Sequence, residues 1–248
     1  MVVRAILSDL VAEEQSLDQF LQRINPRAWQ KTTVHHGWSI QGVVSHLADS
    51  EDYAHNALGE GGSRLSDIES FGSMAALNEA GIAKGAGMRP QDAIEWWRGA
   101  RAKVVEELSR RKADDRVPWF YGDMSAKSFA TARLMETWAH GLDLYAAVGE
   151  EPEDTIRLRH IAWLAWAMLP HAFGEAGLDY PEPVRLEVLG PQYSKWVFGP
   201  EDSGQVIKAQ AGEWCRVAVH RLGLAEAGTI KTTGALAEQA VKVVRAHL

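Results

Sequence analysis

The chain has 248 residues, of which 46% are hydrophobic and 24% charged, and its formal net charge is -7. This is the composition of a globular protein with room for one large or two smaller domains. The acidic balance argues against a nucleic-acid partner, because binding to phosphates needs clustered Lys and Arg. No apolar run approaches the ~20 residues that span a bilayer, acidic residues interrupt the N-terminal segment, and the single cysteine excludes an intrachain disulfide. We therefore expect a cytoplasmic protein, either a monomer or a homodimer.

Apolar residues at helical spacing predict four long helices in the first 150 residues. The predicted helices span about residues 6–24, 39–58, 89–108 and 125–148. Ser39 is placed to cap the second helix, and Pro90 lies in the first turn of the third. Four long helices joined by loops indicate a helix bundle.

The pattern changes after residues 149–154, which have the composition of a linker. A helix is predicted over about residues 155–173. Short alternating runs at 184–190, 194–199 and 205–211 predict strands, and helical spacing returns at 212–224 and 235–248. We therefore predict a mainly α four-helix bundle over residues 1–150, followed by a small α+β domain over residues 151–248.

The fourth predicted helix carries a narrow polar stripe in otherwise apolar surroundings. Glu136, His140 and Asp143 fall within about 60° of one another on a helical wheel, with Arg133 beside them. A stripe of this kind either faces water or directs polar groups at a common partner. Lys and Glu are more typical of a solvated stripe than His, but the helix alone leaves both interpretations open.

The second predicted helix supplies a partner for this stripe. Its polar face is made by Gln41, Ser45, Asp49, Asp52 and Asn56. His46 lies at the edge of the opposite, buried side, where a single histidine is most often a hydrogen-bonded core residue. Glu136 and His140 are one turn apart and can point at one atom together with His46. Imidazole nitrogen and carboxylate oxygen both bind zinc, and three protein ligands leave a position open for chemistry. Since Glu-x-x-x-His also arises by chance, the spacing alone does not decide.

Two segments resemble a known family. The run WSIQGVVSHL from Trp38 and the run RLMETWAHGLDL from Arg133 are similar to the signature segments of the DinB/YfiT-like metal-binding bundle. More narrowly, they resemble the mycothiol-dependent maleylpyruvate isomerase family. That resemblance implies an N-terminal four-helix bundle whose divalent metal, usually zinc, is held by His46, Glu136 and His140.

The resemblance also implies a chemistry. In that family the thiolate of mycothiol adds to an activated double bond or conjugates an electrophile. We therefore expect a divalent metal, mycothiol or another low-molecular-weight thiol, and an electrophilic small-molecule substrate. The C-terminal segments resemble the family's small α+β module, which is sterol-carrier-like. Arg221 matches an arginine of the family's C-terminal helix and is expected to be a catalytic residue that faces a cleft between the domains. A metal-dependent hydrolase and a non-catalytic small-ligand-binding protein are the alternatives.

Several other residues have more than one interpretation. Asp143 either fixes the tautomer of His140 or is an exposed acid, and in a hydrolase Asp143 or His36 is the candidate general base. Arg133 either pairs with Glu136, binds an anionic substrate or extends to solvent. His35 and His36 are loop residues or line the mouth of a cavity. Residues 119–121 (Trp-Phe-Tyr) form a lid or a plug, and Cys215 is expected to be a packed residue.

Overall fold

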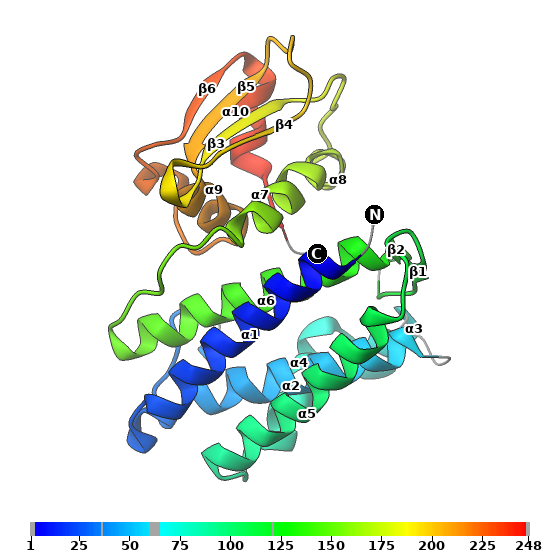
Figure 1. Cartoon of the computed structure of the whole chain (residues 1–248), viewed down its shortest axis with the longest axis vertical. Coiled ribbons are helices and arrows are strands. Elements are labelled where there is room, and N and C mark those ends of the chain that lie inside the picture. The colour runs from blue at the N-terminus through cyan, green and yellow to red at the C-terminus, as the bar shows by residue number, and fades with distance from the viewer. Residues whose placement is uncertain (1–2, 36, 60–64, 121, 247–248) are drawn as a thin grey trace. The chain divides into compact units, whose positions relative to one another are not determined.

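The structure is a computed structural model, which describes residues 3–35, 37–59, 65–120 and 122–246. It divides into two compact units, Met1–Pro152 and Glu153–Leu248. Figure 1 shows the first unit as a set of helices and the second as a small sheet with helices. The prediction of a mainly α protein with a small α+β C-terminal part is confirmed. Among the described residues no helix is both long and apolar enough to cross a membrane.

The four predicted long helices are present and pack against one another (Figure 1). They are α1 (Arg4–Arg23), α2 (Ile40–Leu58), α5 (Pro90–Ser109) and α6 (Ala126–Val148). The Ser39 side chain accepts a hydrogen bond of 3.1 Å from the Gly42 amide and so caps α2. Pro90 opens α5, where a missing amide proton costs nothing. α6 ends at Val148 and is followed by Gly149, whose φ of 79° suits a glycine.

The core of this unit forms where α1, α2, α5 and the C-terminal part of α6 bury their apolar faces. Its largest fully buried members in that cluster include Phe20, Leu21, Ile40, Leu47 and Trp97. α6 is buried along most of its length, as expected of a helix that is apolar around most of its circumference. Two short strands, β1 (Arg116–Val117) and β2 (Met124–Ser125), pair antiparallel just before α6.

Two further helices, α3 (Leu65–Phe71) and α4 (Met74–Gly85), were not predicted. α4 packs on the polar face of α2, so Ser45 and Asp49 are buried rather than exposed to solvent. Lys84 forms an ion pair of 2.5 Å with Asp49. Gly81 and Gly85 allow the close approach, because a Cβ atom at either would overlap the Asp49 or Ser45 side chain.

The second unit combines a four-stranded sheet with helices. The sheet has the order β4-β3-β5-β6, with β3 and β5 parallel and the other pairs antiparallel. Its elements are α7 (Leu158–Ala167), α8 (Leu169–Glu175), β3 (Arg185–Leu189), β4 (Lys195–Phe198), β5 (Val206–Gln210), α9 (Ala211–Ala218), β6 (Lys231–Thr233) and α10 (Ala235–Val243). Three strands were predicted and β6 was not. The predicted helix over 155–173 is divided into two, with Pro170 in the first turn of α8.

Candidate metal centre

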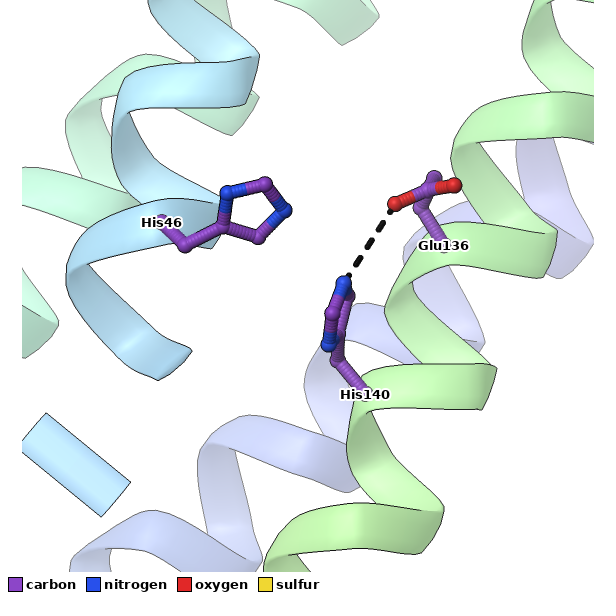
Figure 2. Close-up of side chains that lie close together, drawn as sticks. All are labelled: His46, Glu136 and His140. Atoms are coloured by element: carbon purple, nitrogen blue, oxygen red, sulfur yellow. Dashed lines mark ion pairs between the residues drawn. The ribbon is translucent and has the colours of Figure 1, made fainter. Parts of the chain in front are cut away.

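Three potential metal ligands come together from two helices. His46 lies in α2, and Glu136 and His140 lie one turn apart on α6, with all three side chains directed toward one another (Figure 2). One ligand atom from each residue lies within 4.8 Å of the other two. Nε2 of His140 is 3.5 Å from Oε2 of Glu136. The structure thus joins the polar stripe of α6 to the histidine of α2.

The donor set fits a divalent ion such as zinc. Ligand bonds of about 2.0–2.2 Å in a tetrahedron place ligand atoms about 3.4 Å apart. The separation of 3.5 Å between His140 and Glu136 is close to this value, and a separation at the 4.8 Å limit requires a closure of about 1.4 Å. Side-chain rotation is enough for such a movement. Two imidazoles and one carboxylate leave one tetrahedral position for another ligand.

Asp143 orients His140 from the opposite side. Its Oδ2 atom lies 3.5 Å from Nδ1 of His140, and its side chain is fully buried. The interpretation of Asp143 as an exposed acid is therefore wrong. A carboxylate at Nδ1 favours a proton on that nitrogen and turns Nε2 toward Glu136, which is the arrangement that supports histidine ligands in metal sites.

The charges of the site depend on one another. Burial alone raises the pKa of Glu136, but the hydrogen bond and charge of His140, with the charges of Arg133 and His46, hold that pKa well below its usual value. Burial alone lowers the pKa of His140, whereas Asp143 and Glu136 raise it overall. The carboxylate of Glu136 is thus stabilised by positive charge, and a divalent cation supplies such charge in place of the imidazolium proton.

Arg133 pairs with Glu51 rather than with Glu136, and it does not extend to solvent. It is buried and donates hydrogen bonds of 3.0 and 2.9 Å, from Nε and Nη2, to one oxygen of Glu51 on α2. Its charge also acts on Glu136, one turn along α6. The ion pair therefore joins α2 to α6 beside the three potential ligands, and it leaves the other oxygen of Glu51 buried without a described hydrogen-bond partner.

A buried carboxylate from α1 extends this network. Glu14 is 3% exposed, and Arg101 of α5 lies 3.7 Å from it and 2.6 Å from Asp18. Burial, with the charge of Glu51, raises the pKa of Glu14 to about 8, against the opposing effect of Arg101 and Arg133. Each of the four long helices therefore contributes an ionisable side chain to this buried or partly buried network. Sequence reasoning missed Glu14, although it interrupts the apolar stripe of α1 between Leu10 and Leu17.

Comparisons with known proteins agree with this architecture. Residues 10–145 match the family model of the mycothiol maleylpyruvate isomerase N-terminal domain, which is more than half of the chain. The chain belongs to this family. The resemblance seen in the sequence is thereby confirmed, and the family is named for an enzyme.

Individual relatives span most of the chain. Two uncharacterised proteins of Mycobacterium tuberculosis, MT0041 of strain CDC 1551 / Oshkosh and Rv0036c of strain ATCC 25618 / H37Rv, are each 34% identical over 88% of this chain and 86% of their own length. Crystal structures of the mycothiol-dependent maleylpyruvate isomerase and of a mutant of it match with a TM-score of 0.60. They cover 94% of this chain and 93% of theirs at 16% identity, so they show the shared fold.

Two other residues considered from the sequence, Arg221 and Cys215, belong to the second unit and are described within it. Arg221 lies beyond the end of α9 rather than on it, and it donates to the Val219 carbonyl at 2.8 Å. Its catalytic role in this family member stays a prediction. Cys215 is buried, and burial raises the pKa of its thiol, as expected of a packed residue.

The loop residues have separate outcomes. Trp119 and Phe120 pack with Ile68 and Leu77 in a small apolar cluster, which favours a plug over a lid. His35 is exposed. His36 and Tyr121 lie outside the described residues.

Proposed function

We propose that this protein is a divalent-metal-dependent enzyme that activates a low-molecular-weight thiol, mycothiol or a similar compound, for isomerisation of an electrophilic small molecule or for S-transfer to it. The observation that carries the proposal is the convergence of His46, Glu136 and His140 in a chain that belongs to the mycothiol maleylpyruvate isomerase family. We expect zinc as the metal. We also expect the enzyme to act in the cytoplasm, where low-molecular-weight thiols stay reduced.

The charge of the ligand set suits an anionic sulfur. A free thiol has a pKa of ~8.5 and is mostly protonated at neutral pH. A divalent ion held by His46, Glu136 and His140 lowers the pKa of a coordinated thiol and so supplies the nucleophilic thiolate. Glu136 is the only anion among the three residues, so the occupied site keeps one unit of positive charge, which favours thiolate over neutral thiol.

The surroundings of the three residues define an open and a closed side. The side chain of Glu136 is 27% exposed, whereas that of His140 is 8% exposed and that of Asp143 is fully buried. Asp143 holds His140 from the closed side, so a thiol and its substrate approach from the side of Glu136. The ion pair with Glu51 fixes Arg133, which keeps a positive charge near the Glu136 carboxylate.

The geometry favours thiol chemistry over hydrolysis. A hydrolase needs a general base within reach of a water at the open position. Asp143, one of the two bases considered, faces Nδ1 of His140, which is the nitrogen turned away from Glu136. The other, His36, lies outside the described residues. A non-catalytic ligand-binding protein needs no such constellation, and it is an outcome of the assay below.

The first experiment measures metal content by elemental analysis of the purified wild type beside His46→Ala, Glu136→Ala and His140→Ala. We expect about one ion per chain in the wild type and loss of the ion in each variant. His55→Ala is the control, because His55 lies on the same helix as His46 but outside the group of three. A metal-free wild type that cannot be reconstituted, or an Ala variant that keeps its full complement, refutes the ligand assignment.

The second experiment tests the chemistry with the reconstituted protein. Maleylpyruvate isomerisation and conjugation of an electrophile are each followed with and without mycothiol. A rate that requires both the thiol and the metal supports the proposal. Hydrolysis of ester or amide substrates without thiol, or ligand binding without turnover, supports one of the two alternatives instead.

A further inference from the structure

Trp38 lies against both histidines of the candidate metal centre. The centroid of its ring system is 5.1 Å from that of His46 and 6.3 Å from that of His140. It is stacked on His140 with an interplanar angle of 23°, and the two imidazoles meet edge to face at 4.8 Å. Three rings thus form one aromatic cluster, and two of its members are proposed metal ligands.

Trp38 is held by contacts of both its side chain and its backbone. Its Nε1–H donates to Oε1 of Glu79 on α4 at 3.2 Å. Its backbone carbonyl accepts from the amide of Thr33 at 2.7 Å and from the Thr33 hydroxyl at 2.9 Å. Gly42 packs beside it: a Cβ there would lie 3.4 Å from the Cβ of Trp38 and 3.3 Å from Ile82 of α4. The backbone and Cβ of Trp38 are thus held in place, and the hydrogen bond to Glu79 orients the indole.

We propose that Trp38 is a positioning residue of the metal centre, and that Glu79 orients its indole so that the rings of His46 and His140 stay close to the geometry that binds metal. The inference rests on the proposed function. By this inference α4, which contributes none of the three proposed ligands, helps to position the site through Glu79.

The physical reason is the rotational freedom of an imidazole. Asp143 contacts His140 at Nδ1 on the same helix, but a single polar contact of 3.5 Å leaves the ring able to tilt. A flat indole stacked on that ring restricts the tilt and keeps water from its face. The same indole also touches His46, so one side chain couples the orientations of ligands from two helices.

The test measures metal dissociation constants by competition with a chromophoric chelator, using zinc and cobalt, in the full-length protein. Trp38→Phe keeps a ring but removes the N–H donor, Glu79→Leu removes the acceptor, and Glu79→Gln retains one. Because Glu79 is exposed, Glu79→Leu leaves the core unchanged. Trp96→Phe is the matched control. Like Trp38, Trp96 donates its indole N–H to a carboxylate, in this case that of Asp52 on α2, at 2.8 Å.

We expect Trp38→Phe and Glu79→Leu each to raise the metal dissociation constant about tenfold, within the range for groups that orient ligands. The double variant is expected to be no worse than either single one, because both remove the same hydrogen bond. Glu79→Gln and Trp96→Phe keep the wild-type constant. The visible absorption of the cobalt protein changes only in Trp38→Phe, Glu79→Leu and their combination.

A second measurement does not depend on metal. In the metal-free protein, stacking on Trp38 shifts the ring-proton resonances of His140, and Glu79→Leu is expected to move them while Trp96→Phe does not. If Trp38→Phe and Glu79→Leu keep the metal dissociation constants, cobalt spectra and His140 resonances of the wild type, the inference is wrong. The assignment of the metal ligands is not affected by that result. Multiplied effects in the double variant also overturn it. A wild type that binds no metal overturns the proposed function and this inference with it.

Discussion

The buried carboxyl of Glu14 makes stability depend on pH in a way that one substitution isolates. Its folded-state pKa is raised to about 8, first by burial and then by the charge of Glu51, from an ordinary value of 4.5. Between these two values the folded chain holds a proton that the unfolded chain releases. Stability therefore falls as pH rises from about 5 to 8, and the decline levels off once Glu14 is ionised in both states.

The magnitude follows from the size of this window. One proton changes the folding equilibrium about tenfold per pH unit, so the contribution of Glu14 amounts to about 4 kcal/mol across three units. Glu14→Gln keeps the shape of the side chain and the possibility of a hydrogen bond but cannot ionise. The variant is expected to lack this decline and so to gain stability relative to the wild type as pH rises.

Urea unfolding at half-unit steps between pH 5 and 8 measures the effect, with chelator present so that metal affinity does not contribute its own pH dependence. The informative quantity is the difference between wild type and variant, in which most other titrating groups cancel. Glu13→Gln, the same change one residue earlier at a half-buried position, is the control. Parallel pH profiles for wild type and Glu14→Gln refute the assignment of a raised pKa to Glu14.

Three further predictions follow from the buried groups. Asp143→Asn is expected to weaken metal binding about 10–100-fold without loss of helical circular dichroism, because His140 loses its carboxylate partner; unchanged affinity contradicts this. Arg133→Met leaves Glu51 buried without its partner and is expected to lower the free energy of unfolding by about 3–5 kcal/mol. Adding Glu51→Leu is expected to restore most of that loss. If denaturant unfolding shows that the losses of the two substitutions simply add, the two residues do not interact as an ion pair. Cys215 is expected to react with a thiol reagent only after denaturation, and rapid labelling of native protein contradicts its burial.

The long helices of the first unit were predictable because their signals are local. Apolar residues at helical spacing face one core, and the ends of α2 and α5 carry Ser39 and Pro90, residues that favour helix starts for backbone reasons. The convergence of His46 with the residues of α6 was partly predictable, since the apolar surroundings of α6 indicate a central helix. A helical wheel does not give the position along the helix axes at which two helices come into contact.

The buried charges escaped prediction for a different reason. Glu14 and Arg133 are 119 residues apart in sequence and share a network only because α1, α2, α5 and α6 pack together. A charge at a core position has no distinctive spacing of its own. It shows in the sequence only as a polar residue within an apolar stripe, such as Glu14 in α1. The residue that stabilises it when it is buried lies elsewhere in the chain.

α4 has both a weak local signal and a contact with a distant part of the chain. Its sequence, MAALNEAGIAKG, is rich in alanine and glycine and has little large apolar periodicity, so it gives a weak helix signal. Yet the spacing of Gly81 and Gly85 by one turn is what lets a helix come close to the buried Ser45 and Asp49 of α2. The same docking brings Glu79 to Trp38. A polar face on one helix and paired small residues on the next are therefore better interpreted together, as two halves of a contact, than as a solvated surface and a loop.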